Sequence, residues 1–176
     1  MDEKQLLTDC INGNHHAQKR LYEKYAGKMY AVCLRYAKDK STAEDYLQEG
    51  FIRVFSKLSK FRSEGSFEGW IRTIMVNTSL EMLRKNNILT KSEDYQQAIN
   101  LIEPDPSIIE KLQEEQLLEC IQSMPPGFRA VFNLYAIEGY NHREIGDMLN
   151  ISEGTSKSQF ARARIWLQQK IQQLHQ

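Results

Sequence analysis

The chain has 176 residues, enough for one ordinary domain or two small ones. Apolar residues make up 41% of it and charged residues 26%, a composition typical of globular proteins rather than of disordered chains. The formal net charge is zero, which argues against binding nucleic acid through overall charge alone. The charge is unevenly placed, however, because residues 1–88 carry 15 Lys and Arg against 11 Asp and Glu.

Several classes of protein are disfavoured at this point. No run of about 18 apolar residues occurs, and the acidic N-terminus lacks a secretory apolar core, so we expect a cytoplasmic protein without membrane insertion. The three cysteines are widely spaced and no histidine pairs with a cysteine at ligand spacing, so we predict no disulfide, metal site or cofactor. Glycine-rich phosphate loops and the HExxH and GxSxG motifs are missing, and we predict that the protein is not an enzyme and has no catalytic residues.

Apolar spacing in the first half predicts helices and no strands. The helical period runs over residues 21–36 and again over 43–58, with Ser41-Thr42 as the N-cap signal of the second helix. The segment KFRSEGSFEG, residues 60–69, predicts a loop because it holds two glycines and two serines. A further helix is expected from about residue 67 to 85.

The pattern breaks in the middle of the chain. Asparagines, an acidic run and Pro104-Asp105-Pro106 predict an acidic, mobile linker. Apolar spacing then returns from Ile108, and Pro125-Pro126-Gly127 ends one helix and starts the next. We therefore predict an all-α protein with two small helical domains, residues 1–88 and 108–176, joined by a flexible linker over 89–107.

The stretch HREIGDMLNISEGTSKSQFARAR, residues 142–164, predicts a helix-turn-helix. Gly146 stands where two steeply crossing helices approach each other, Asn150 tolerates a positive φ in the turn, and Ser152 caps the second helix. In such units the second helix enters the major groove of DNA with its N-terminal half at the base edges. The alternative is an ordinary surface hairpin of two helices, with the basic residues on a solvated face.

One residue departs from the helix-turn-helix pattern. Ser156 stands where an apolar wedge residue is usual, so we expect Phe160 and Trp166 to take over more of the packing.

Two stretches of the N-terminal half also carry functional signals. AEDYLQEGFIRVF, residues 43–55, has an apolar side and a charged side, which taken alone is a solvated helix face. Residues 61–85 combine Phe61, Phe67 and Trp70 with basic residues around a flexible loop, an arrangement that suits unpaired bases. The alternative is that the three aromatic residues belong to the core, and for Trp70 we favour the core.

Taken together and in this order, the motifs resemble bacterial sigma factors of the extracytoplasmic function (ECF) type. The resemblance covers almost the whole chain. It is carried by GNHHAQKRLYEKYAGKMYAVCLRY, AEDYLQEGFIRVF, FEGWIRTIMVNTSLEMLRK and MPPGFRAVFNLYAIEGYNHREIGDMLNISEGTSKSQFARAR. Such proteins bind core RNA polymerase and direct it to promoters, so the resemblance implies a role in transcription initiation with polymerase and promoter DNA as partners. Many members are held inactive by an anti-sigma factor, which the resemblance adds as a third partner.

The resemblance also implies roles for individual residues. Region 2, the N-terminal domain, would bind core polymerase through Asp45, Gln48 and Glu49. Its loop at Ser63–Phe67 would capture a flipped base of the −10 element. The implied −10 residues are Phe61, Ser63, Glu64, Ser66, Phe67, Asn77 and Arg84.

Region 4, the C-terminal domain, would read the −35 element. The implied residues are Thr155, Lys157, Ser158, Ala161, Arg162 and Arg164, of which Thr155 and Arg164 are candidates for phosphate contacts. Family members often carry a small aliphatic residue at Ser156 and a basic residue at Gln159, so both positions differ here. A rival hypothesis is a stand-alone helix-turn-helix regulator that binds duplex operators, but it leaves AEDYLQE and the Phe61–Trp70 loop unexplained.

Overall fold

The computed structural model describes residues 2–86 and 113–174, and within these ranges the chain forms helices and connecting loops with no strand. The backbone divides into two units, Met1–Met82 and Leu83–Gln176. The all-α prediction is therefore confirmed. The predicted linker, residues 89–107, lies outside the described residues, as do Ile108 and the rest of the chain up to residue 112.

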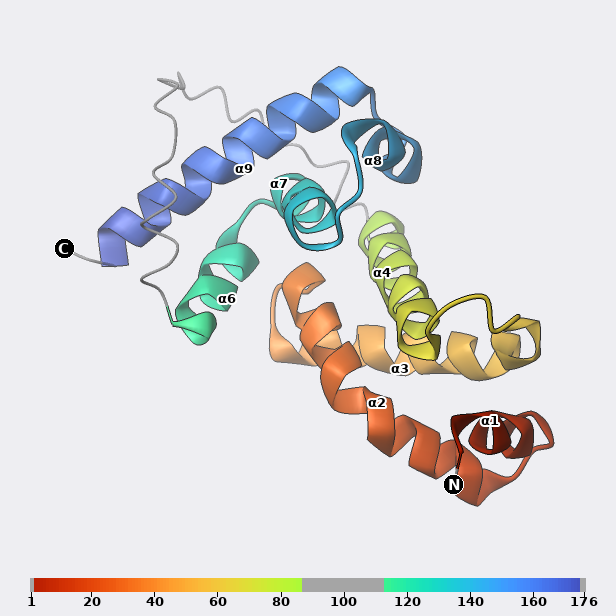
Figure 1. The fold of residues 1–176 in the computed structure, drawn as a ribbon. Helices are drawn as coiled ribbons and strands as arrows, with labels where there is room; N and C mark the ends of the chain where they lie inside the picture. The colour runs from red at the N-terminus through yellow and green to blue at the C-terminus, as the bar shows by residue number, and fades with distance from the viewer. Residues whose placement is uncertain (1, 87–112, 175–176) are drawn as a thin grey trace. The chain divides into compact units, whose positions relative to one another are not determined.

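The N-terminal unit is a small helical bundle (Figure 1). Its elements are α1 (Glu3–Ile11), α2 (His15–Tyr36), α3 (Lys40–Lys57), the short 3-10 turn η1 (Leu58–Lys60) and the start of α4 (Phe67–Lys85). The bounds of α4 match the helix predicted over residues 67–85. Helix α1, by contrast, was not predicted, and α2 begins six residues before the apolar period that predicted it.

Apolar faces of α2, α3 and α4 form the core of this unit. The fully buried side chains include Leu21, Met29, Tyr36, Tyr46, Ile71 and Met75. Helices α3 and α4 approach each other closely at Gly50, where an added Cβ atom would lie 2.2 Å from the sulfur of Met75. Burying each of these large side chains stabilises the fold by about 1.5–3 kcal/mol, which is why the apolar period predicted the helices well.

The N-terminus of α3 corrects one prediction. Its N-cap residue is Asp39, whose carboxylate accepts the backbone N–H of Thr42 at 2.8 Å. Ser41 and Thr42, the predicted cap signal, lie inside the first turn instead. Hydrogen bonds from the Thr42 side chain, and then from its backbone N–H, lower the pKa of Asp39, because they stabilise the charged carboxylate.

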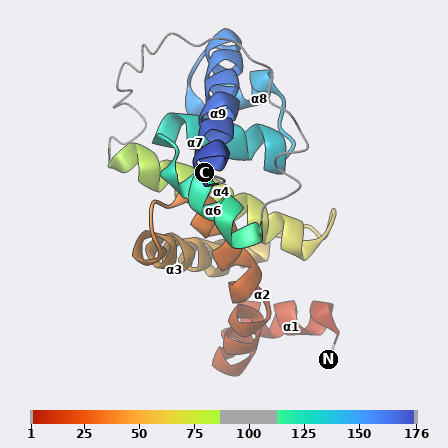
Figure 2. The same ribbon diagram turned by 90° about the vertical axis from the view of Figure 1, so that its left-hand side faces the viewer.

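The C-terminal unit is arranged along one long helix (Figures 1 and 2). Its elements are α6 (Glu114–Ser123), α7 (Pro126–Phe132), the π-helical turn η2 (Asn133–Ile137), α8 (His142–Leu149) and α9 (Glu153–Leu174). Helix α6 ends at Ser123 and α7 begins at Pro126, as the two prolines predicted. Helices α6, α7 and α8 all pack against α9.

A buried cluster joins α6 to the C-terminal half of α9. It consists of Cys120, Ile121, Met124, Ala163, Leu167 and Ile171. Trp166 packs against this cluster rather than in the helix-turn-helix wedge, so the prediction for Trp166 was wrong. Phe160 does pack in the wedge, with its ring centroid 4.5 Å from that of Tyr135.

The turn between α8 and α9 has the geometry that the sequence predicts. Asn150 adopts φ 56° and ψ 47°, the left-handed region that ends α8. The Ser152 hydroxyl accepts the backbone N–H of Thr155 at 3.0 Å, which caps α9. Gly146 leaves no room for a side chain, because an added Cβ would lie 2.7 Å from the carbonyl oxygen of Ile151. The steep helix crossing therefore depends on a glycine at this position.

The described residues were also compared with the requirements of a membrane span and of a metal site. No helix among them combines the length and the hydropathy needed to cross a bilayer. Within the same residues, no group of three or more His, Cys, Asp or Glu could hold a metal ion. The three cysteines are buried thiols, and burial raises the pKa of Cys33 to about 11, so this thiol stays protonated at neutral pH.

The close approach at Gly146 gives a stability prediction. Gly146→Ala should destabilise the C-terminal unit by about 1–3 kcal/mol, because a backbone carbonyl must move to admit the methyl group. The measurement is urea unfolding followed by Trp166 fluorescence in a Trp70→Phe background, since the chain has one tryptophan in each half. Gly154→Ala is the matched control. Its Cβ would meet nothing nearer than 3.8 Å, so it should leave stability unchanged or raise it by up to about 1 kcal/mol. Equal effects of the two substitutions would contradict the steric explanation.

Candidate nucleic-acid and polymerase interfaces

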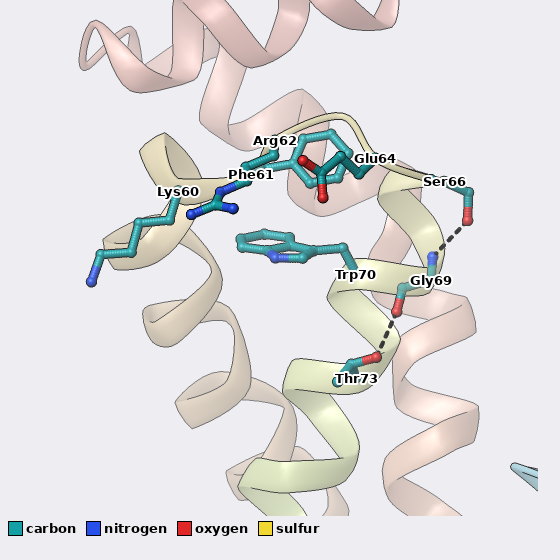
Figure 3. A pocket seen from close by; sticks show the side chains of 9 residues that line it. Lys60, Phe61, Arg62, Glu64, Ser66, Gly69, Trp70 and Thr73 are labelled. Atoms are coloured by element: carbon teal, nitrogen blue, oxygen red, sulfur yellow. Dashed lines mark hydrogen bonds between the residues drawn. The ribbon is translucent and has the colours of Figure 1, made fainter. Parts of the chain in front are cut away.

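The loop between η1 and α4 turns sharply over the first turn of α4 (Figure 3). Ser63 has φ 56° and Gly65 has φ 132°, so two of its residues have left-handed backbone conformations. The Ser66 hydroxyl accepts the backbone N–H of Gly69 at 3.0 Å and holds the end of the loop on the helix. The side chains of the loop are thereby presented around a fixed point at the start of α4.

A cavity of about 410 Å³ lies between this loop and α4. It is lined by Lys60, Phe61, Arg62, Glu64, Gly65, Ser66, Gly69, Trp70 and Thr73. Figure 3 shows the Trp70 indole along one side, with Arg62 and Glu64 across from it. The Trp70 ring lies 5.6 Å from Phe67 and 5.4 Å from Phe61, measured between centroids. A flat aromatic wall beside two basic side chains and a hydroxyl is suited to an unpaired base and its phosphate.

The −10 residues that the sequence predicted in this loop line two cavities, one on each side of it. Phe61, Glu64 and Ser66 line the cavity just described. Ser63 and Phe67 line a second cavity of about 510 Å³, on the side of the loop that faces α1. The expectation that Trp70 is a core residue was wrong, because its ring is only half-buried and forms the cavity wall.

Two further −10 candidates extend this site along α4. Asn77 and Arg84 are both exposed. They follow Trp70 by seven and fourteen residues, close to two and four helical turns, so all three share one face of α4. Thr73 lies between Trp70 and Asn77, and its hydroxyl donates a hydrogen bond to the carbonyl of Gly69 at 3.0 Å.

The charged face of α3 presents the three predicted polymerase-binding residues. Asp45 and Gln48 are exposed, whereas Glu49 is half-buried. Ile52, which sequence reasoning missed, continues the same face and is 64% exposed. Its signal was available in the sequence, since it follows Asp45 by seven residues and falls outside the apolar period of the core.

Glu49 also has a structural role that the sequence did not reveal. Its carboxylate accepts the Nε of Arg53 at 3.0 Å, and the guanidinium of Arg53 binds Glu81 of α4 at 2.5 and 3.1 Å. These hydrogen bonds, first to Glu81 and then to Glu49, raise the pKa of Arg53. Glu49 therefore belongs to the contact between α3 and α4, and Asp45 is the cleaner position for testing polymerase binding.

Helix α9 presents the predicted duplex-reading residues on its outer side. Lys157, Ser158, Arg162 and Arg164 are exposed, and Thr155 and Ala161 are half-buried. Ser158 and Arg162 follow Thr155 by three and seven residues, so they form one stripe along the helix. Hydroxyls and a guanidinium in such a stripe can contact both phosphates and purine edges.

The charge at the start of α9 is partly neutralised within the helix. Lys157 pairs with Glu153 at 2.6 Å, and this hydrogen bond lowers the pKa of the Glu153 carboxyl. Both side chains are at least half exposed, so the pair adds little stability. Because Lys157 is paired with Glu153, the main groups available to DNA in the first two turns of α9 are the hydroxyls of Thr155 and Ser158.

Comparison with known proteins identifies both halves. Residues 21–88 match the family model for sigma-70 region 2, and residues 114–167 match that for sigma-70 region 4. The chain belongs to the ECF family of RNA polymerase sigma factors. It thus binds core RNA polymerase and directs transcription initiation at specific promoters. The family consists of initiation factors rather than enzymes, and the region 2 match leaves the stand-alone operator-binding hypothesis without support.

Individual relatives agree with this assignment. The sigma factor is 34% identical to ECF sigma factor SigE of Mycolicibacterium smegmatis over 82% of its own length, and it spans 57% of that protein. It is 26% identical to the ECF sigma-E factor of Haemophilus influenzae, with 99% and 97% of the two chains covered. A solved sigma factor, RpoE of Bartonella quintana in complex with the anti-sigma factor NepR, has the same fold with a TM-score of 0.54 at 19% identity, covering 88% and 96% of the chains.

The structure accounts for both departures of this sigma factor from the family pattern. Ser156 is completely buried, and its Oγ lies 2.9 Å from Nδ1 of His142. The His142 ring stacks on Tyr135, with centroids 4.3 Å apart at 10°. Gln159 is half-buried and lies against the backbone of Gly127, where an added Cβ would meet its Oε1 at 3.0 Å. Both polar residues therefore contact other helices of the unit.

The environment of His142 predicts a pH dependence of stability. Burial, and then the nearby charge of Lys157, lower the pKa of His142 below its ordinary value. The unfolded chain therefore takes up the proton first as the pH falls, and the C-terminal unit should lose stability as the pH drops through about 6.5 and on to the lowered pKa.

The measurement is the urea midpoint reported by Trp166 between pH 8 and 5. His142→Asn should flatten the pH profile. His15→Asn is the matched control, because His15 is an exposed histidine that also follows an asparagine N-cap, and this variant should keep the wild-type profile. A wild-type profile in His142→Asn would contradict the assignment.

Proposed function

We propose that the sigma factor divides promoter recognition between its two halves. Residues 1–88 bind polymerase and capture an unpaired base of the −10 element, and residues 108–176 read the duplex −35 element, with residues 89–107 as the linker. The observation that carries the proposal is the cavity between the loop and Trp70, which lies within the region 2 match. Flipping a base out of the duplex costs a few kcal/mol, and stacking on an aromatic wall offsets part of that cost.

The proposed −10 residues surround the loop and continue along α4. Phe61, Glu64 and Ser66 contact the captured base, and Ser63 and Phe67 hold the loop from the side of α1. Asn77 and Arg84 guide the strand along the exposed face of α4. The volume of the cavity lies in the range of small-molecule sites, which supports capture of one base rather than of a longer segment.

On α9, side chains divide into base readers and phosphate contacts. Lys157, Ser158, Ala161 and Arg162 face base edges, and Thr155 and Arg164 contact phosphates. Exposure of the stripe through Ser158 and Arg162 supports this division, since the opposite side of α9 is buried against α6 and α7. We also infer an anti-sigma factor as a partner and the cytoplasm as the compartment, where polymerase and promoter DNA are found.

Run-off transcription with purified core polymerase tests the proposed function as a whole. Purified core polymerase with the full chain should start transcription at promoters where core enzyme alone starts none, and the chain should co-purify with core at about one-to-one. Tight, salt-insensitive operator binding by the chain alone would instead favour a stand-alone regulator.

Arg162→Ala should lower transcription from −35-dependent promoters about 5- to 100-fold, because one good base contact contributes about 1–3 kcal/mol. Co-purification with polymerase should not change. Lys19→Ala is the control, since it removes an exposed cation from the surface of α2. If Arg162→Ala weakened polymerase binding as strongly as transcription, its role in base reading would be wrong.

Asp45→Arg, unlike Arg162→Ala, should abolish co-purification with polymerase. The urea midpoint of the variant should not change. Charge complementarity with the polymerase is reversed, while the contact between α3 and α4 through Glu49 and Arg53 is left intact. Glu23→Arg on α2 is the matched charge reversal and should bind polymerase normally. Full binding by Asp45→Arg would remove this face of α3 from the interface.

A further inference from the structure

The buried hydroxyl of Ser156 requires a hydrogen-bond partner. Ser156 is completely buried, on the side of α9 that faces α8 and η2. A buried hydroxyl without a partner costs about 1–3 kcal/mol, whereas an aliphatic residue at this position would carry no such requirement. The Nδ1 atom of His142, 2.9 Å from Oγ, meets it.

His142 joins three segments at this point. It is the first residue of α8, directly after Asn141, whose side chain and that of Glu144 cap the helix reciprocally. Its ring stacks on Tyr135 of η2 and lies 5.8 Å from the ring of Phe160 on α9. The bond to Ser156 ties the ring to α9, whereas the stack on Tyr135 involves no residue of α9.

We propose that His142 is a positioning residue for duplex recognition, which acts through Ser156 to set the rotation of α9 in the major groove. Ser156 lies between Thr155 and Lys157, so a change in its position moves the neighbouring side chains that face the DNA. The inference rests on the proposed function of α9, and it adds a residue that does not itself contact DNA.

Burial, and then the charge of Lys157, favour the neutral form of His142, which can accept a hydrogen bond, whereas Glu153 acts in the opposite direction. Lys157 and Glu153 of α9 act on the ring, Arg143 and Glu144 follow it in sequence on α8, and η2 contributes Tyr135 as its titratable group. A neutral ring with its proton on Nε2 accepts the Ser156 hydroxyl at Nδ1. Asparagine at this position keeps an acceptor, and phenylalanine keeps a ring without one.

A double-mutant cycle tests the proposal in the reconstituted holoenzyme. The variants are His142→Phe, Ser156→Ala and both together. The measured quantity is the ratio of the apparent Kd on a promoter with a scrambled −35 element to that on the intact promoter. Each single variant should lower this ratio about fivefold, the effect of one buried hydrogen bond. The double variant should lose no more than either single one, because neither polar group is then left without its partner.

Conservative and control variants separate positioning from folding. His142→Asn should keep the ratio within about twofold of wild type, since the acceptor is retained. His15→Phe, the same substitution at the exposed histidine that opens α2, should leave the ratio unchanged. Urea midpoints from Trp166 identify any variant that is unfolded at the assay temperature, and Ser156→Ala and His142→Asn carry the test if His142→Phe is one of them.

The results that would overturn the proposal are distinct from failure of the proposed function. Single variants with a wild-type ratio, losses that multiply in the double variant, or a His142→Asn loss as large as that of His142→Phe would each overturn it. A wild-type holoenzyme whose affinity does not depend on the −35 element would instead remove the proposed role of α9, and the positioning role with it.

Discussion

One constraint governs the proposed surfaces on the helices: a helix of 3.6 residues per turn that buries one face must present the residues between its core positions on the other face. On α3 the burial of Tyr46 and Leu47 places Asp45 and Gln48 outward, next to the core residues in sequence and opposite to them in space. On α9 the burial of Ser156 and Ala163 does the same for Ser158 and Arg162. The orientation of each functional side chain is thus fixed by its buried neighbours, so substitutions in the core would alter recognition without touching polymerase or DNA.

The loop site depends on an element that the apolar period did not reveal. Glu3 of α1 accepts hydrogen bonds from Lys24 and from the hydroxyl of Tyr25, and these bonds lower the pKa of its carboxyl. The Tyr25 ring meets Phe67 edge-on at 5.5 Å, and Phe67 in turn stacks on Trp70. A continuous series of contacts therefore runs from α1 to the cavity wall. With nine residues and only Leu6 and Cys10 buried, α1 has too short an apolar pattern to be recognised from the sequence, and its helical form depends on packing against α2.

Sequence reasoning succeeded where one local rule decided the structure and failed where several competed. Glycine at 146 and asparagine at 150 had a single steric explanation, and the turn was predicted correctly. The cap of α3 was assigned to Ser41-Thr42, whereas the structure places Asp39 at the N-cap, two residues earlier, with its carboxylate on the Thr42 N–H. Trp166 was misassigned although the helical period excluded it: six residues separate it from Phe160, which places the two rings on different sides of α9. The π-helical turn η2 had no local signal in the sequence, and its Tyr135 packs on His142 and Phe160, which lie on two other helices.

The departure at Gln159, together with a salt bridge on α9, bears on how tightly the free protein can hold duplex DNA. Gln159, where relatives often have a basic residue, lies against Gly127, and Lys157 is paired with Glu153. The N-terminal half of α9 therefore contributes little net positive charge, and the salt-dependent attraction to phosphates that supports most non-specific binding is weak. In the proposed function, recognition of the −35 element then relies on base-edge contacts from an accurately rotated helix, and on polymerase to raise its local concentration at the promoter. A helix with few phosphate contacts tolerates little misalignment, which is why a buried hydrogen bond between two uncharged side chains can matter as much as an exposed arginine.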